Sequence, residues 1–88
     1  MIYIYEVHMS GGEGHEHIES VRWRNPNTGD SGDSLRSQMV RWINEGGKAY
    51  VTDGTNTVRV GVVDADPPYI RTYADDVWTD NLLSLPRY

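Results

Sequence analysis

Residues 33–47 read DSLRSQMVRWINEGG, and this stretch decides the expected fold because it contains the clearest helix pattern in the chain. Asp33 or Ser34 suits the N-cap of such a helix. Gly46-Gly47 suits its end, since glycine adopts the left-handed conformation without penalty. The apolar residues are spaced to share one helical face, which predicts a helix packed on a sheet: Leu35, Met39, Trp42 and Ile43.

Two strands are predicted before this helix. Residues 2–9 and 17–24 both alternate, and the glycine-rich segment 10–14 joins them in a hairpin. We expect 2–9 to be an edge strand that is free to pair with a second copy. In the first strand one face would carry Tyr3, Tyr5, Val7 and Met9 and the other Ile2, Ile4, Glu6 and His8. In the second, one face would carry His17, Glu19, Val21 and Trp23 and the other Ile18, Ser20, Arg22 and Arg24.

The segment between the second strand and the helix, residues 25–32, is rich in turn formers and is predicted as a turn. Three strands are predicted after the helix, over 48–52, 57–63 and 69–73, separated by the loop 53–56 and by a break at Pro67-Pro68. Residues 74–76 form a predicted turn. A helical turn over 79–83, capped by Thr79 or Asp80, would end before Pro86.

The predicted order is therefore ββ-α-βββ. This order is typical of an α+β fold in which one helix packs on one face of the sheet. We expect a single domain over residues 1–88, with a mainly antiparallel sheet of about five strands and a docked C-terminal segment.

Composition excludes several classes of protein. The net charge of −5 argues against sequence-independent nucleic-acid binding. No apolar run has the length of a transmembrane helix and no signal peptide is visible, so no membrane role is expected. The chain has no cysteine, which excludes disulfides and thiolate metal sites and fits a cytoplasmic protein.

Aromatic and arginine residues give the main candidate binding surface. The chain has three Trp, six Tyr and no Phe, and seven of its eight basic residues are Arg. Such residues are enriched at protein interfaces, and they also stack on a base and clamp a phosphate. The alternative is that they pack around a small core and form internal salt bridges. The candidate residues for binding a ligand or partner are Arg22, Trp23, Tyr50, Arg59, Tyr69, Arg71, Tyr73 and Trp78.

Two weaker candidate sites lie near the first hairpin. His8, His15 and His17 offer neutral imidazoles for a divalent metal, which Glu13 or Glu19 could complete. The glycine-rich segment offers backbone N–H groups to an anion, although no Gly-Lys-Ser/Thr or dinucleotide pattern follows. Its candidate residues are Ser10, Gly11, Gly12 and Gly14. For both sites the alternative is a loop ordered by local hydrogen bonds.

No pattern in the sequence indicates an enzyme. None of the serines lies in a Gly-x-Ser-x-Gly elbow, and the paired carboxylates Asp75-Asp76 lie in a predicted turn. No catalytic residue is therefore assigned, and no cofactor is expected beyond a possible divalent metal.

Four segments carry a resemblance to a known family: 18–23 (IESVRW), 39–43 (MVRWI), 69–72 (YIRT) and 80–86 (DNLLSLP). They are similar to domain-of-unknown-function family 3892, small proteins of bacteria, notably actinobacteria, and some of their phages. The resemblance spans nearly the whole chain. It implies a soluble intracellular domain and carries over no catalytic residue.

Three functions remain open. The first is a non-enzymatic binding module that self-associates, as a homodimer, or binds a partner protein. The second is a binder of a phosphate-bearing small ligand such as a nucleotide, with Arg22, Arg59 or Arg71 on the phosphate. The third is a metal-dependent hydrolase that uses His8, His15 and His17.

Overall fold

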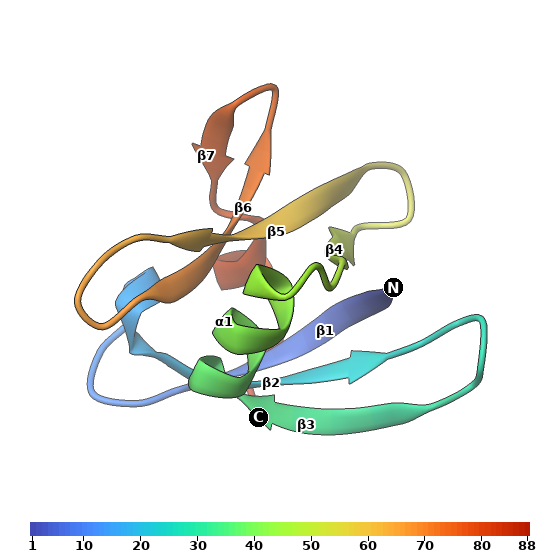
Figure 1. Ribbon diagram of the computed structural model, residues 1–88, viewed down its shortest axis with the longest axis horizontal. Helices are drawn as coiled ribbons and strands as arrows, with labels where there is room; N and C mark the ends of the chain where they lie inside the picture. Colours follow the sequence, from blue (N-terminus) through green and yellow to red (C-terminus); the bar gives the residue numbers. More distant parts are fainter.

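The computed structural model describes residues Met1–Tyr88 and consists of one seven-stranded sheet with a single α-helix on one face (Figure 1). The helix α1 spans Arg36–Asn44, and two 3₁₀ turns, η1 and η2, span His15–His17 and Asn81–Ser84. The strands are β1 (Ile2–Met9), β2 (Ile18–Arg24), β3 (Ser31–Leu35), β4 (Ala49–Thr52), β5 (Thr57–Val63), β6 (Tyr69–Ala74) and β7 (Val77–Thr79).

The strand order across the sheet is β3-β2-β1-β4-β5-β6-β7. All neighbours are antiparallel except β1 and β4, which pair in parallel through Ile2 and Tyr3. The α+β class and the mainly antiparallel sheet are confirmed, but the sheet has seven strands and not about five. The expectation that residues 2–9 form an edge strand was wrong, because β2 and β4 flank β1 on its two sides.

The two additional strands lie in segments whose composition is typical of turns. Trp23 pairs directly with Gly32 of β3, and a Cβ at Gly32 would lie 3.1 Å from the Trp23 ring, so glycine leaves room for the indole. β7 follows a two-residue turn in which Asp75 and Asp76 have φ values of 52° and 63°. Aspartate tolerates this left-handed conformation, but Asp-Asp is not the usual signal of a hairpin.

Two irregularities change the predicted strand faces. The β1–β2 register steps from Ile4↔Trp23 to Glu6↔Arg22, and later from His8↔Ser20 to Met9↔Ile18. Each step leaves one extra residue, Tyr5 and Glu19, which reverses the alternation beyond it. As a result Ile2, Ile4 and Val7 are all buried although strict alternation separates Val7 from the other two, and Ile18 and Val21 are likewise both buried.

The predicted helix is confirmed, but its start is later than expected. Asp33 and Ser34 belong to β3, and Leu35 is the N-cap, with 51% of its surface exposed instead of packed in the core. The Leu35 N–H donates to Gln38 Oε1 at 2.8 Å, half of a capping box. Gly46, with φ of 103°, ends the helix as predicted. Met39 and Val40 are buried, and Trp42 and Ile43 pack against the core.

The C-terminal segment is docked beside β1, as expected. The Val7 N–H donates to the Pro86 carbonyl at 3.0 Å, and the Tyr88 N–H donates to the Val7 carbonyl at 3.2 Å. Leu82 of η2 is fully buried, and Asp80 is the N-cap of η2 but makes no side-chain capping bond. No helix in this fold combines the length and the apolar character needed to cross a membrane.

Candidate functional site

The strands β1, β4, β5, β6 and β7 carry two adjacent rows of side chains in direct cross-strand register. Directly paired residues point to the same face of a sheet, and neighbouring residues in a strand point to opposite faces. The first row, called the inner row, faces the core and contains Ile2, Ala49, Val60, Thr72 and Thr79. The second, called the outer row, lies on the opposite face and contains Tyr3, Tyr50, Arg59, Tyr73 and Trp78.

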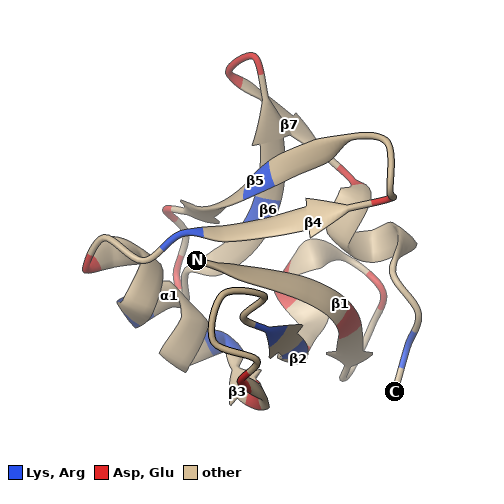
Figure 2. Cartoon of the chain, turned by 90° about the vertical axis from the view of Figure 1, so that its right-hand side faces the viewer, with Lys and Arg blue, Asp and Glu red and all other residues tan.

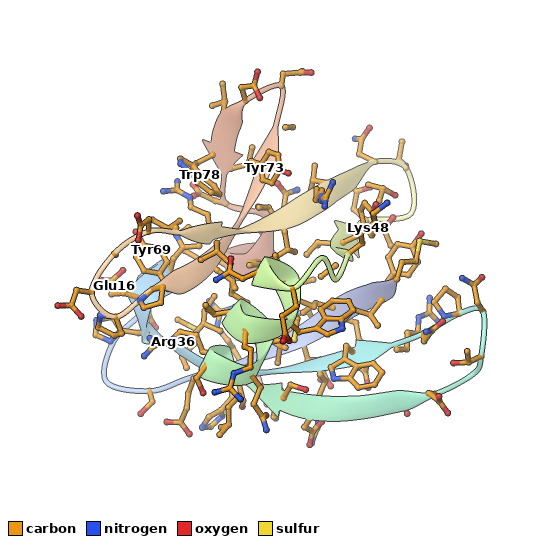
Figure 3. The ribbon with its side chains drawn as sticks, in the orientation of Figure 1. Glu16, Arg36, Lys48, Tyr69, Tyr73 and Trp78 are labelled. Atoms are coloured by element: carbon orange, nitrogen blue, oxygen red, sulfur yellow. The ribbon has the colours of Figure 1, made fainter.

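The outer row is formed mainly by aromatic rings that are only partly covered. Tyr3 and Tyr50 have ring centroids 6.0 Å apart, and Tyr73 meets Trp78 edge to face at 5.7 Å. Trp78 has 43% of its surface exposed to solvent. Figure 3 shows Tyr73 and Trp78 side by side at the β6–β7 end of the sheet. The Tyr73 ring lies against Gly61, where a Cβ would approach it to 2.8 Å. The Tyr73 ring therefore packs directly on the backbone of β5.

Basic side chains lie among these rings. Arg59 is exposed at the centre of the row and forms no ion pair or hydrogen bond, and the same holds for Arg24, which pairs with Tyr3 and extends the row onto β2. Lys48 directly precedes β4 and is also exposed (Figure 3). In the part of the chain from β4 to β7 every Asp lies in a loop or turn, and Figure 2 shows basic positions on β5 and β6 and just before β4.

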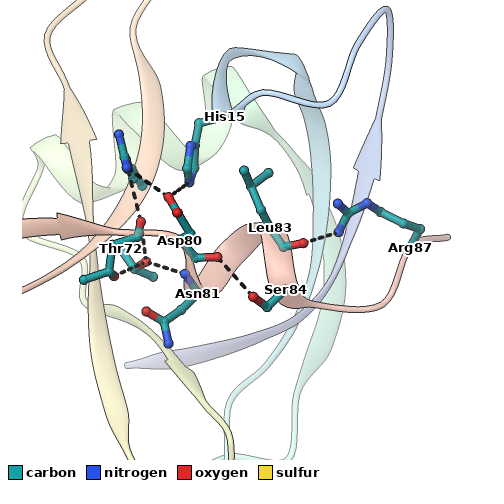
Figure 4. A network of polar contacts seen from close by, with 9 residues as sticks. His15, Thr72, Asp80, Asn81, Leu83, Ser84 and Arg87 are labelled. Carbon is teal, nitrogen blue, oxygen red and sulfur yellow. Dashed lines mark hydrogen bonds and ion pairs between the residues drawn. The ribbon is translucent and has the colours of Figure 1, made fainter.

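Arg71 lies on the same face but is held in a polar network. Its Nε donates to the Thr79 carbonyl at 3.1 Å and its Nη2 to Asp80 Oδ1 at 2.9 Å. The Asp80 carboxylate therefore binds Arg71 instead of capping η2 (Figure 4). We call the surface formed by the outer row with Arg24, Lys48, Tyr69 and Arg71 the aromatic face.

His15 approaches the same network from η1. Its Nε2 lies 3.8 Å from Asp80 Oδ1 and is buried without a hydrogen-bond partner (Figure 4). Burial, and secondly the nearby Arg71 charge, lower the pKa of His15, while Asp80 and Glu16 oppose the shift. The imidazole is thus held neutral, and it serves as a packed part of the fold.

The structure separates two of the predicted binding residues from the others. Arg22 is neutralised by Glu6 at 3.2 Å and Asp33 at 3.3 Å, and its guanidinium stacks 4.0 Å from the centre of the Tyr88 ring. Its pKa is raised, first by the hydrogen bond to Glu6. Trp23 lies beside α1, where its Nε1 donates to Ser34 Oγ at 3.0 Å. The remaining six predicted residues share the aromatic face.

The three histidines are not brought together. The His8 Nδ1 contacts the Tyr88 carbonyl, His15 lies near Asp80, and the His17 Nδ1 lies 3.2 Å from the Ser10 carbonyl. No group of three or more His, Cys, Asp or Glu side chains is arranged to hold a metal ion.

The predicted anion loop is likewise not assembled into a site. Ser10 lines a hollow beside the start of α1 together with Glu16, Glu19 and Arg36. The two carboxylates outweigh the one arginine, so the charge of the lining disfavours an anion. Gly11, Gly12 and Gly14 do not line this hollow. The His17 ring packs on Gly12, and the Ser10 N–H donates to the His17 carbonyl at 2.9 Å, so local contacts order this loop.

Sequence reasoning did not include Tyr3 and Lys48 among the binding residues. Tyr3 enters the outer row because β1 pairs with β4, and Arg24 extends the row because β2 pairs with β1. The β1–β4 pairing connects segments that are far apart in the chain. The alternation of Ile2, Tyr3 and Ile4 was the one available signal, and it does not identify the neighbouring strand.

A family model described as a protein of unknown function, DUF3892, matches residues 3–86. The chain belongs to the DUF3892 family. The match includes all four segments on which the resemblance was based, and it includes the complete outer row of this DUF3892 domain. No curated protein and no solved structure matches the chain.

Proposed function

We propose that this DUF3892 domain is a non-enzymatic binding module whose aromatic face binds an acidic segment of a partner protein. The observation that carries the proposal is the outer row, in which an unpaired Arg59 lies between partly exposed aromatic rings in direct register across five strands. Tyr, Trp and Arg dominate the binding energy of protein interfaces. A chain without cysteine needs no oxidising compartment, and we place this binding in the cytoplasm.

The shape of the aromatic face favours an extended segment. The row with Arg24 crosses six strands, and at about 4.8 Å per strand it is roughly 24 Å long, the length of about seven extended residues. Each end has a hollow. One of about 230 Å³ is lined by Tyr73, Asp76 and Trp78, and one of about 700 Å³ includes Tyr3, Arg24 and Leu85. We infer a partner segment with acidic residues at its centre and apolar side chains at its ends.

The positive charge of the aromatic face favours a different protein as its partner, and not a second copy of this chain. A two-fold interface brings the same patch of both molecules together. On the aromatic face this would oppose the unpaired Arg24, Lys48 and Arg59 of one copy to the same groups of the other. Like charges placed opposite one another cost free energy, whereas a segment rich in Asp and Glu neutralises them.

The test combines sedimentation with quantitative capture of partners. We expect a monomer that retains a defined set of proteins, and we expect Arg59→Glu to reduce their recovery at least roughly tenfold. The matched control is Arg41→Glu, an exposed and unpaired arginine on α1, which should retain them fully. Equal recovery by the two variants would contradict the proposal. A dimer that Arg59→Glu dissociates would replace the partner protein with a second copy.

A phosphate-bearing small ligand is a second candidate, supported by the same unpaired Arg59. Aromatic rings stack on a base while arginine binds phosphate in a bidentate manner. Because Arg71 is already bound to Thr79 and Asp80, Arg59 replaces it as the expected phosphate ligand. Titration calorimetry with nucleoside phosphates should give saturable heat that Arg59→Lys strongly reduces, since lysine lacks the planar fork. An unchanged affinity in Arg59→Lys would remove this candidate.

A further inference from the structure

Two tryptophans line a cleft on the other side of the molecule, between α1 and the strands β2 and β3. The cleft has a volume of about 400 Å³, within the range of sites for small molecules. Trp23 comes from β2 and Trp42 from α1, and the buried Ile2 and Met39 line its apolar base. None of these residues belongs to the aromatic face. Ile2 and Trp23 only precede Tyr3 and Arg24 of that face in the sequence, so the cleft is independent of the function proposed above.

Both indoles are held in place by their surroundings. The Trp23 Nε1 donates to Ser34 Oγ at 3.0 Å, and its ring lies over Gly32. The Trp42 ring lies against Gly47, where a Cβ would approach the ring to 2.2 Å. Glycine at these two positions therefore allows each indole to rest on backbone and still line the cleft. Rigid aromatic walls reduce the entropy lost on binding a ligand.

The charge of the cleft is negative. Asp30 is the one charged residue among those that line it, and its carboxylate forms no ion pair or hydrogen bond. The nearby amide oxygens are engaged, because Asn25 Oδ1 accepts from the Asn27 N–H and Gln38 Oε1 accepts from the Leu35 N–H. An anionic ligand would meet Asp30, and a cation would find both the carboxylate and the negative faces of two indoles.

We propose that this cleft binds a small organic cation with an apolar body, such as an alkylated ammonium or guanidinium group. The apolar base accepts the alkyl groups, the indole faces attract the positive charge, and Asp30 lies at the rim as the counter-charge. The same group occurs in free metabolite-like cations and in methylated lysine or arginine side chains of proteins. The test distinguishes these two sources.

The direct measurement follows the indole N–H signals of the labelled protein by NMR during titration with choline. The chain has three tryptophans, so Trp23 and Trp42 report on the cleft while Trp78 is the reference on the other face. We expect saturable shifts of the first two and none of the third. The neutral isostere 3,3-dimethylbutan-1-ol should bind roughly threefold or more weakly, because it lacks the charge that the rings attract.

Two carboxylate variants test the charge. Asp30→Asn should weaken choline binding roughly threefold, whereas Asp64→Asn, at an exposed carboxylate in the β5–β6 loop, should leave it unchanged. Equal affinity for choline and its neutral isostere, equal effects of the two variants, or an absence of shifts at Trp23 and Trp42 would each overturn the proposal. A trimethyl-lysine peptide that binds more tightly than choline would assign a protein source, and one that binds no more tightly would assign a free cation.

Discussion

The inner and outer rows lie on the same five strands, one residue apart, and differ in burial and in the pairing of their polar groups. In the inner row Ala49, Val60 and Thr72 have 0%, 1% and 0% exposure. The Thr79 hydroxyl donates to Thr72 Oγ1 at 2.7 Å, and the Thr72 hydroxyl donates to the Thr79 carbonyl at 3.2 Å. In the outer row the rings are partly exposed and the central Arg59 has no partner. The inner row lies in the core, whereas the outer row leaves aromatic surface and one guanidinium exposed.

Because of this difference, stability and the proposed binding depend on different residues of the same strands. Because neighbouring residues of a strand face opposite sides, each strand contributes one residue to the core and one to the surface. A change in the inner row should therefore lower the free energy of unfolding, and a change in the outer row should alter binding with little effect on folding.

The largest expected effect comes from the core side of β6. Ile70 faces the core with 0% exposure, and Ile70→Ala should lower the free energy of unfolding by about 2–5 kcal/mol through lost burial and a cavity. Trp78→Ser, at a residue with 43% exposure in the outer row, should cost less than about 1 kcal/mol. Urea unfolding of both variants measures the contrast, and equal losses would break the distinction between the core side of the strands and the outer row.

A smaller effect should follow from the polar part of the inner row. Thr72 Oγ1 accepts from the Asn81 N–H at 3.1 Å and from Thr79 Oγ1 at 2.7 Å. Thr72→Val keeps the shape but leaves these partly buried donors without their acceptor, and we expect a loss of about 1–3 kcal/mol. Thr57→Val, at an exposed position of β5, is the control and should stay within about 0.5 kcal/mol of wild type in the same urea measurement.

The pH dependence of stability tests the polar network of Arg71, Asp80 and His15 beside the aromatic face. The pKa of His15 is lowered in the fold, so the unfolded chain binds a proton more readily and stability should fall as pH decreases below about 6.5. Thermal melts between neutral and mildly acidic pH should show this loss. His15→Leu should flatten the dependence, and His17→Gln, at a half-exposed imidazole, should preserve it. A steeper slope in His15→Leu would refute the assignment.

The smallest expected effect concerns the turn that positions Trp78. Asp75 and Asp76 both have positive φ, a conformation for which Asn-Gly is preferred. The double change Asp75→Asn with Asp76→Gly should raise stability by about 0.5 kcal/mol and leave the outer row intact. Differential scanning calorimetry should detect a higher melting temperature, and a lower one would show that the two carboxylates have an unrecognised partner.

Local patterns in the sequence predicted the helix and five of the seven strands, because periodicity and turn residues are local properties. They did not predict β3, whose Ser-Gly-Asp composition is typical of a loop, or β7, which follows the turn at Asp75 and Asp76. The bulges at Tyr5 and Glu19 were also missed, since each depends on a partner strand. The order of strands, above all the parallel β1–β4 pair, is set by long-range packing.

The placement of the candidate residues shows the same division between local and long-range information. Six of the eight candidate residues lie on the aromatic face. Five of them are on β4, β5 and β6, strands that local alternation predicted, and Trp78 is on β7, which it did not predict. Arg22 lies apart from the aromatic face, and local patterns did not show its ion pairs because Glu6 and Asp33 come from other strands. The role of Trp42 in the cleft was not visible, because a helical stripe does not distinguish a core residue from one that lines a cavity.

The central claim is that the outer row is the binding surface, and side-chain footprinting tests it most directly. Hydroxyl radicals would label the isolated chain and the complex recovered with the wild-type protein. Trp78 and Leu35 are matched probes, with 43% and 51% exposure on different parts of the molecule. The account predicts that the complex protects Trp78, Tyr73 and Tyr50 while Leu35 remains labelled. Protection of Leu35 with Trp78 still labelled would contradict it.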